Sequence, residues 1–190
     1  IAVLHLIESF LIIINGHEGK MPIFMDKDGR IVGGFNMMRF WPVPFVVAIN
    51  NGGFTVPLTV IAVLGYGDFA LTKYPKEKSK ETAFYLFLFS IILLLFSQLS
   101  IKYYYFKYIA SVFAPVAHES VIQIGRKREK HGKAIFLPSN RGIKILDTMA
   151  KGVGEKMGLN SGDIILSLNG KEVNSIEEVK DILHFIPFYI

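Results

Sequence analysis

The chain has 190 residues, of which 51% are hydrophobic, and its formal net charge at neutral pH is +5. It contains no cysteine, which excludes disulfide bonds and thiolate metal ligands. Up to about residue 124, long apolar runs alternate with short charged loops, whereas the sequence from Gly125 onward has the charge density and turn residues of a soluble domain. The composition therefore predicts a membrane region followed by one small globular module.

Four apolar segments of the first part are candidates for membrane-spanning helices. Residues 82–101 carry no charge, and a helix of that length rises about 30 Å, which is the thickness of the hydrocarbon core of a bilayer. Residues 1–14 are predicted to be the end of another span. Residues 103–117 are predicted to form a further span, in which the side chain of Lys107 extends toward one end.

The remaining candidate is the uncharged run 40–67, for which a span is placed at about residues 42–69. As one straight helix this run would be about 42 Å long, which is too long without tilt. It also contains three prolines and the helix-breaking cluster Asn50-Asn51-Gly52-Gly53. The run is therefore either one kinked span or a short re-entrant piece followed by a span from Phe54.

The basic residues gather in loops beside these apolar runs. Residues 73–80 contain four lysines, and residues 125–133 contain five lysines and arginines against Glu129 alone. The positive-inside rule assigns both segments to the cytoplasm, and two spans between them agree with that assignment. We therefore expect a multi-pass protein of the cell membrane with a cytoplasmic C-terminal module. Basic residues in this pattern indicate contact with a lipid bilayer and no nucleic acid partner.

The C-terminal part shows the turn signals of a small mixed fold. Asn169-Gly170 is the dipeptide favoured in tight type I′ hairpin turns. Ser175 and Glu178 form an S-x-x-E capping box at the start of a helix with an apolar stripe. The predicted elements are a strand, a short helical turn, a second strand and a longer helix, at residues 142–147, 151–158, 164–168 and 175–184.

These elements carry a family resemblance. The stretches are Gly142-Ile-Lys-Ile-Leu-Asp, Glu155-Lys-Met-Gly-Leu159, Gly162-Asp-Ile-Ile-Leu-Ser-Leu-Asn-Gly170 and Val173-Asn-Ser-Ile-Glu-Glu178. Together they closely resemble a bacterial PDZ domain, over roughly residues 133–190. The loop at residues 150–154 departs from the family, which often has P-G-S-P-A there. The resemblance implies a domain that binds an extended peptide, often a free C-terminal tail, as an added strand.

The predicted fold class is an α-helical multi-pass transmembrane region followed by a small α/β-type, mostly β, PDZ-like domain. The predicted boundaries are residues 1–124 for the transmembrane region, 125–133 for a basic juxtamembrane linker and 134–190 for the PDZ-like domain. The chain opens inside an apolar run at Ile1 and stops just after Phe188-Tyr189, which resembles the start of a strand. Both ends are therefore expected to be truncated.

The resemblance implies a peptide groove between one strand and the longer helix. The groove strand is expected at residues 134–137, or is supplied after Ile190. Val179 and Leu183 lie one helical turn apart, so they either line the groove together or belong to the core of the domain. The residues predicted to bind peptide are Ile135, Phe136, Leu137, Ile176, Val179 and Leu183.

One pair of polar residues invites a catalytic interpretation. His118-Glu119 matches part of the HExxH zinc motif of membrane-embedded site-2 proteases, which also carry PDZ domains. That motif needs a second histidine four residues on, and Ile122 stands there instead. We therefore predict no enzyme, no cofactor and no metal site. His5 and Glu8, three residues apart, are predicted to be neighbours on one helical face.

Further stretches resemble the MinJ-like membrane proteins of Gram-positive bacteria. They are Gly29-Arg-Ile-Val-Gly-Gly-Phe35, Arg39-Phe-Trp-Pro-Val-Pro44, Gly65-Tyr-Gly-Asp68 with Pro75-Lys-Glu-Lys-Ser79, and His118-Glu119 with Gly125-Arg126. The resemblance implies a membrane-anchored adaptor that recruits cell-division or polarity proteins. The alternatives are a degenerate or incomplete site-2 protease and a PDZ-bearing accessory of transport or secretion.

Overall fold

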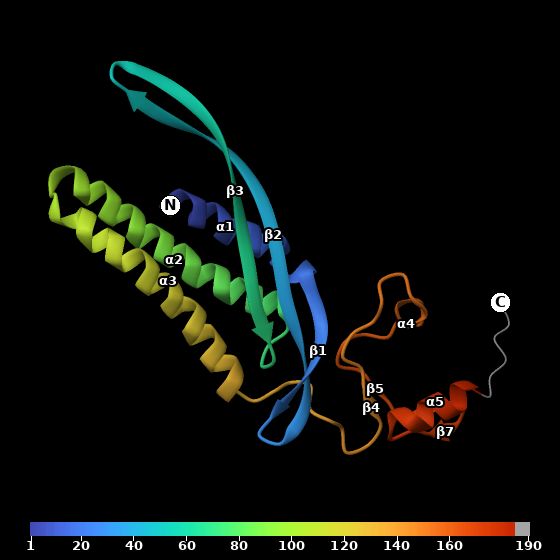
Figure 1. Cartoon of the computed structure of the whole chain (residues 1–190). Helices are drawn as coiled ribbons and strands as arrows, with labels where there is room; N and C mark the ends of the chain where they lie inside the picture. The colour runs from blue at the N-terminus through green and yellow to red at the C-terminus, as the bar shows by residue number, and fades with distance from the viewer. Residues whose placement is uncertain (185–190) are drawn as a thin grey trace.

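The computed structural model of the protein describes residues 1–184, so the strand expected at Phe188-Tyr189 lies outside the described residues, as does the end of the predicted module. A three-stranded antiparallel sheet, in the order β1-β2-β3, runs beside three helices, and smaller elements follow (Figure 1). In chain order the elements are α1 (Ala2–Asn15), the 3₁₀-helix η1 (Gly16–Gly19), β1 (Lys20–Lys27), β2 (Arg30–Asn51), β3 (Phe54–Ala70), α2 (Pro75–Lys102), α3 (Tyr105–His131), β4 (Ile143–Lys144), α4 (Val153–Lys156), β5 (Ile164–Ile165), β6 (Ser167–Leu168), β7 (Lys171–Glu172) and α5 (Ile176–His184).

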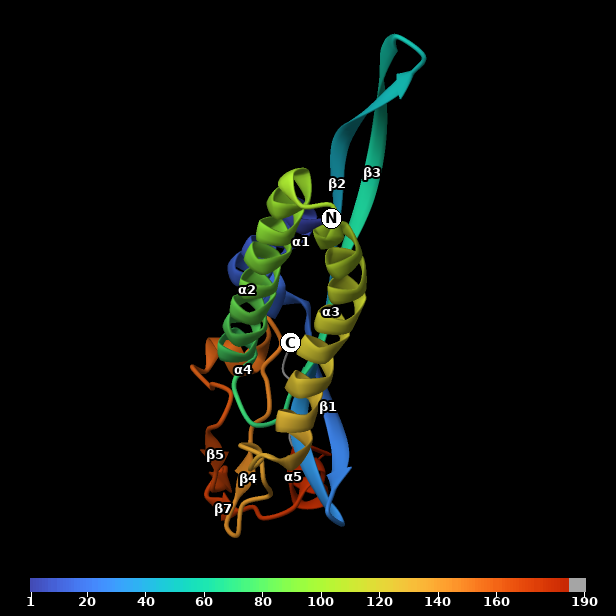
Figure 2. The same ribbon diagram turned by 90° about the vertical axis from the view of Figure 1, so that its left-hand side faces the viewer.

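Strands β2 and β3 form a long ribbon that extends beyond the helices (Figures 1 and 2). Their register is continuous from Phe35 opposite Ala70 to Asn51 opposite Phe54. Gly52 and Gly53 close the turn with φ angles of 57° and 111°, which glycine adopts at no steric cost. The breaker cluster of the sequence is thus a hairpin turn.

The three prolines of the ribbon fit this register. In an antiparallel pair, hydrogen-bonded and non-hydrogen-bonded residue pairs alternate, and the pair that flanks a two-residue turn is hydrogen-bonded. Counting from that turn places Pro42, Pro44 and Pro57 in non-hydrogen-bonded pairs, where the missing N–H would have pointed outward. The prolines therefore leave the ladder intact and remove donors from its outer edges, which discourages pairing with another strand.

The multi-pass α-helical transmembrane region predicted for residues 1–124 is wrong. The segment 42–69 is β-structure rather than a span. Segments 1–14 and 103–117 coincide largely with α1 and α3. Among the described residues, only α2, which contains segment 82–101, is long and apolar enough to cross a membrane by length and composition.

The main core lies between the helices and one face of the sheet. Side chains of β2 and β3 that alternate along the strands, such as Phe35, Met37 and Tyr66, are buried against the helices. The sides of the core are completed by Ile12 of α1 and Phe89 of α2. This face-by-face burial is the period-2 pattern of a half-buried strand. The helices thus fix the lower part of the ribbon, while its far end stays uncovered.

A buried ion cluster ties the end of β3 to α2 and α3. The Lys78 side chain is 1% exposed, and its Nζ lies 3.5 Å from Asp68 Oδ2 and 3.5 Å from Glu129 Oε1. Glu129 Oε2 accepts hydrogen bonds from the backbone N–H groups of Leu71 and Thr72, at 2.8 and 2.7 Å. The lysine-rich segment 73–80, predicted to be a cytoplasmic loop, therefore contains the start of α2, with Lys78 inside the protein.

The local signals of the C-terminal module, residues 134–184, are confirmed. Asn169 and Gly170 both have positive φ and join β6 to β7, as a type I′ turn requires. Ser175 Oγ accepts from the Glu178 backbone N–H at 3.2 Å, which caps α5 as predicted. Among the described hydrophobic residues beyond 144, only Val173 is fully buried. The module thus has little core of its own.

Candidate functional site

Residues 134–137 continue the large sheet where β3 ends. The Gly33 N–H donates to the Phe136 carbonyl at 2.9 Å, and the Ile135 N–H donates to the Leu71 carbonyl at 2.9 Å. Because β3 stops at Ala70, this segment occupies the place beside β2 that the next residues of β3 would have taken. The segment predicted to be the groove strand is therefore fastened to the body of the protein.

Gly33 permits this close approach. A Cβ built on Gly33 would lie 3.1 Å from the Cβ of Phe136 and 3.1 Å from Cδ1 of Leu146. Such contacts are tighter than a side chain normally makes, so a larger residue at this position would require Phe136 and Leu146 to shift by a few tenths of an ångström. An ion pair of 2.8 Å between Lys20 Nζ and Asp147 Oδ1 fastens the module to β1.

The Phe136 ring lies between the large sheet with its helices and the C-terminal module. It is 5% exposed and makes edge-on contacts with Phe35 and Tyr74, at centroid distances of 5.6 and 5.8 Å. Lys144 Nζ lies 5.9 Å from the same ring and donates to the Ile135 carbonyl at 2.9 Å. These contacts keep the backbone of residues 134–137 in place next to β4.

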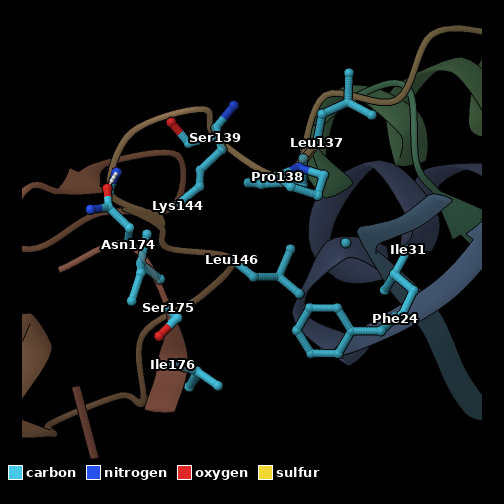
Figure 3. Close-up of a pocket in the computed structure, with 14 residues that line it drawn as sticks. Phe24, Ile31, Leu137, Pro138, Ser139, Lys144, Leu146, Asn174, Ser175 and Ile176 are labelled. Atoms are coloured by element: carbon cyan, nitrogen blue, oxygen red, sulfur yellow. Dashed lines mark hydrogen bonds between the residues drawn. The ribbon is translucent and has the colours of Figure 1, made fainter. Parts of the chain in front are cut away.

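A cavity of about 270 Å³ opens beside this segment (Figure 3). Phe24 and Ile31 of the β1–β2 hairpin stand on one side of it, and Leu146 lies between that hairpin and Ile176 at the start of α5. The complete lining is Phe24, Ile31, Gly33, Phe136, Leu137, Pro138, Ser139, Gly142, Ile143, Lys144, Leu146, Asn174, Ser175 and Ile176. The cavity is therefore mostly apolar, with a few polar groups at one end, as is usual for a ligand site.

The start of α5 is positioned by hydrogen bonds that cross the module. Asn174 Oδ1 accepts from the Gly142 N–H at 2.9 Å, and Glu178 Oε2 accepts from the Asn174 N–H at 2.7 Å. These bonds link the capping box of the helix to the residue before β4. They hold Ile176, which is 57% exposed, at the edge of the cavity.

The structure brings some of the predicted peptide-binding residues together and separates others. Phe136, Leu137 and Ile176 line the cavity, and Ile135 lines an adjoining hollow. Val179 is half-buried and Leu183 is exposed, and neither is among the residues that line this cavity or the three hollows next to it.

Sequence reasoning missed the residues that close the cavity from the other side, Phe24, Ile31 and Leu146. The alternation of Ile31, Gly33 and Phe35 was the available signal, because it places all three on one face of a strand. The sequence does not show that a segment more than 100 residues away would dock on that face.

His118 and Glu119 lie on α3, away from this cavity. The His118 ring is 5.0 Å from the His5 ring, and His5 Nδ1 lies 2.9 Å from Glu8 Oε2, as predicted for that neighbouring pair. Across residues 1–184, no three side chains of His, Asp or Glu are placed to hold a metal ion.

The pH dependence of stability should change when His118 is replaced. Burial lowers the pKa of His118 below 6.5, and His5 lowers it further, while Glu8 and Glu119 act in the opposite direction. Because the unfolded state takes up the proton first, the stability linked to this group is complete above about pH 6.5 and falls as the pH is lowered through it. In His118→Gln, the loss of Tm between about pH 7.5 and about pH 5.5 should be smaller than in the native protein. An unchanged pH profile would show that His118 is not the titrating group.

The family model of the PDZ domain matches residues 145–185. The match begins just after β4 and reaches through α5, so the part of the chain that carries Leu146 and Ile176 is a PDZ domain. No curated protein and no solved structure matches the chain significantly.

Proposed function

On the premise that residues 145–185 form a PDZ domain, we propose that the protein is an adaptor that binds an extended peptide segment of a partner protein. The observation that carries this proposal is the apolar cavity between residues 136–139 and the start of α5. PDZ domains bind peptides as an added strand beside a helix, and this cavity lies between an extended segment and a helix. The proposed activity is binding and includes no catalytic step.

The ends of the cavity fit this role. The polar side chains of Ser139, Asn174 and Ser175 lie at one end, and the exposed apolar side chain of Ile176 also borders the cavity (Figure 3). An extended peptide fits such a lining, because its backbone can hydrogen-bond to the polar groups while its alternate side chains point to the apolar ones. Peptide binding would also cover apolar surface that the small core of the module leaves in water.

Selection from a random peptide library on the immobilised full chain tests this function. We expect a family of related peptides with an apolar residue at a fixed position and micromolar affinity. When the library is displayed on phage, the free synthetic peptide should displace the selected phage from the immobilised chain. Displaying the library with free C-termini and, separately, with blocked C-termini shows whether a terminal carboxylate is needed. A full chain that enriches no sequence in either format would contradict the proposal.

We further propose that the adaptor works at a membrane surface. The supporting observation is the end of the molecule farthest from the C-terminal module, where the ribbon tip and the α2–α3 turn both lie (Figures 1 and 2). Apolar side chains are exposed there on both faces of the ribbon and on the helices. They include Val46, Ile49, Phe54, Val56, Ile61, Val63, Ile92, Leu95, Leu99 and Ile101.

The distribution of these side chains favours lipid over a protein partner. A protein covers one contiguous face, whereas these exposed residues alternate between both faces of the ribbon and include residues of α2. The α2–α3 turn also carries exposed Tyr103, Tyr104, Tyr105 and Tyr108, with Lys102 and Lys107 beside them. Tyrosine and lysine are the residues that settle at the headgroup level of a bilayer.

The ribbon itself limits how deeply the molecule can insert into the bilayer. Its outer edges still carry backbone groups with no strand beside them, and such groups are too costly to place in hydrocarbon. The proposed position is therefore the boundary between headgroups and acyl chains, where water remains available.

In line with the MinJ-like resemblance, we propose that the module faces the cytoplasm and recruits cell-division proteins there.

Flotation with vesicles of phosphatidylglycerol and phosphatidylcholine tests the membrane proposal. The native chain should float with the lipid, and Phe54→Ser with Ile101→Ser should weaken binding by at least about a hundredfold, because each exposed side chain loses about 1.5–3 kcal/mol of burial. Met149→Ser with Val153→Ser, two equally exposed apolar residues of the C-terminal module, is the matched control and should float normally. Equal loss in both double variants, or no flotation of the native chain, would contradict the proposal.

A further inference from the structure

We propose that the β1–β2 hairpin, which lies outside the PDZ domain, forms the second wall of the peptide site and selects peptides whose apolar residue is flanked by acidic residues. This inference rests on the proposed peptide-binding function. It assigns a ligand chemistry to the cavity and a recognition role to a hairpin at the other end of the sequence.

The hairpin contributes two apolar side chains to the cavity. In the register of β1 and β2, Phe24 lies opposite Gly33 and Asp26 lies opposite Ile31, so Phe24 and Ile31 share one face. They are 74% and 66% exposed, although both are large apolar residues. Both border the cavity (Figure 3). An apolar side chain placed between them and Ile176 would cover all three.

The position of the hairpin relative to the PDZ domain is fixed, which a specificity wall requires. The Gly33–Phe136 hydrogen bond connects the hairpin to the segment just before the PDZ domain, and the Lys20–Asp147 ion pair connects β1 to the domain itself. Leu146 of the PDZ domain lies close to Gly33 and so adds an apolar contact between the hairpin and the domain. The wall therefore does not depend on a mobile loop, and its contacts with a peptide cost little ordering entropy.

The surface next to the cavity is basic. Three hollows adjoin it along Leu137, and their lining contains several cationic side chains and one carboxylate, Asp28. The cationic side chains are Lys27, Arg30, Lys133 and Lys144. Lys27 and Lys144 donate to backbone carbonyls. Arg30 and Lys133 are exposed, and within residues 1–184 neither forms an ion pair.

The charge of this rim determines the ligand class. An apolar slot beside an excess of positive charge complements a peptide that carries aspartate or glutamate next to its apolar residue. Because Arg30 comes from the hairpin and Lys133 from the chain just before residue 134, a bound peptide would contact both parts of the protein. Exposed charges of this kind act mainly on specificity and association rate, and salt weakens them.

Two double variants of the full chain test the inference with peptides selected on the native protein from the random library. Phe24→Ser with Ile31→Ser should weaken binding by at least about tenfold, because both side chains lose their burial against the peptide. Arg30→Glu with Lys133→Glu should retain the apolar preference in a new selection, lose the enrichment of acidic residues, and remove the salt dependence of affinity. Met25→Ser, on the opposite face of the same hairpin, is the matched control and should bind as the native chain does.

The outcomes separate this inference from the proposed function. Peptides that bind the native chain and both double variants equally would overturn the hairpin wall and leave the PDZ adaptor intact. A library that enriches no peptide on the native chain would overturn both. If charge reversal at Arg30 and Lys133 abolishes vesicle binding and leaves peptide selection unchanged, the rim contacts anionic lipid and the inference is overturned.

Discussion

Lys78→Met should destabilise the protein by about 3–5 kcal/mol, the largest effect we expect from a single substitution. The lysine is 1% exposed and lies between the carboxylates of Asp68 and Glu129, which are also buried. Removing it leaves two negative charges in the interior without a cation. A buried charge that has lost its partner destabilises the folded state by far more free energy than the intact ion pair contributes to stability.

The hydrogen bonds around this cluster prevent the Asp68 and Glu129 carboxylates from moving apart once Lys78 is removed. Thr82 Oγ1 donates to Asp68 Oδ2 at 2.6 Å, and Glu129 accepts from the backbone of Leu71 and Thr72. Both carboxylates are therefore held where they are by groups that would lose their own partners on movement. The end of β3 and the start of α2 should lose their order together.

Thermal melting of the full chain at neutral pH measures the effect, with an expected fall in Tm of roughly 10 °C. Lys80→Met, an exposed lysine on the same helix, should change stability by less than about 0.5 kcal/mol. Adding Glu129→Gln to Lys78→Met should recover part of the loss, because one of the two unpaired charges is removed. A Lys78→Met protein as stable as the Lys80→Met control would contradict the role of the cluster.

Ile176→Asp should weaken peptide binding by at least about a hundredfold, the largest effect we expect on function. The side chain borders the cavity and is 57% exposed, so the native fold does not depend on its burial. In the complex, a carboxylate there would be covered by an apolar peptide side chain, and Lys144, the cation that lines the same cavity, is held by its hydrogen bond to the Ile135 carbonyl. Burying the carboxylate costs several kcal/mol, out of about 8 kcal/mol for a micromolar complex.

Isothermal titration with a library-selected peptide measures this loss, and thermal melting of the same protein shows whether the fold is kept. Lys180→Asp introduces the same charge at an exposed position of α5 outside the cavity and should bind peptide normally. Retained binding in Ile176→Asp would exclude the cavity as the peptide site. A collapsed melting transition would show that Ile176 belongs to the core.

Local signals of the C-terminal module could be predicted because each depends on a few adjacent residues. The Asn169-Gly170 turn needs two positive φ angles, and the capping box needs a serine and a glutamate three residues apart. Their spacing in the sequence contains the whole of the interaction. The strand predicted at residues 164–168 is interrupted at Leu166, whose carbonyl accepts from the Val173 N–H at 3.1 Å. That contact is not visible in the strand's own sequence.

The interpretation of residues 40–67 as a membrane span failed because hydropathy does not distinguish a helix from a ribbon that is apolar on both faces. Such a ribbon has no alternation of polar and apolar residues, which is the usual signal of a strand. Its β-branched residues, its paired glycines and its three prolines favoured a hairpin over a helix. The prolines carried the most information, since Pro42 and Pro44 are two residues apart and therefore share one side of a strand.

The candidate site could be predicted only in part for a related reason. Phe136, Leu137 and Ile176 follow from the family resemblance, since they belong to the module. Phe24 and Ile31 reach the cavity through the tertiary contact of Gly33 with Phe136, across more than 100 residues of sequence. No local pattern encodes such a contact, and only the fold reveals it.

Photo-crosslinking of a bound peptide identifies the residues that contact its apolar side chain. A library-selected peptide carrying benzophenone at its apolar position is bound to the full chain and irradiated, and the adducts are located by mass spectrometry. We expect adducts at Ile176 and Leu146 of the PDZ domain and at Phe24 or Ile31 of the hairpin. Adducts confined to Val179 and Leu183, or to residues of α1, α2 or α3, would contradict this prediction.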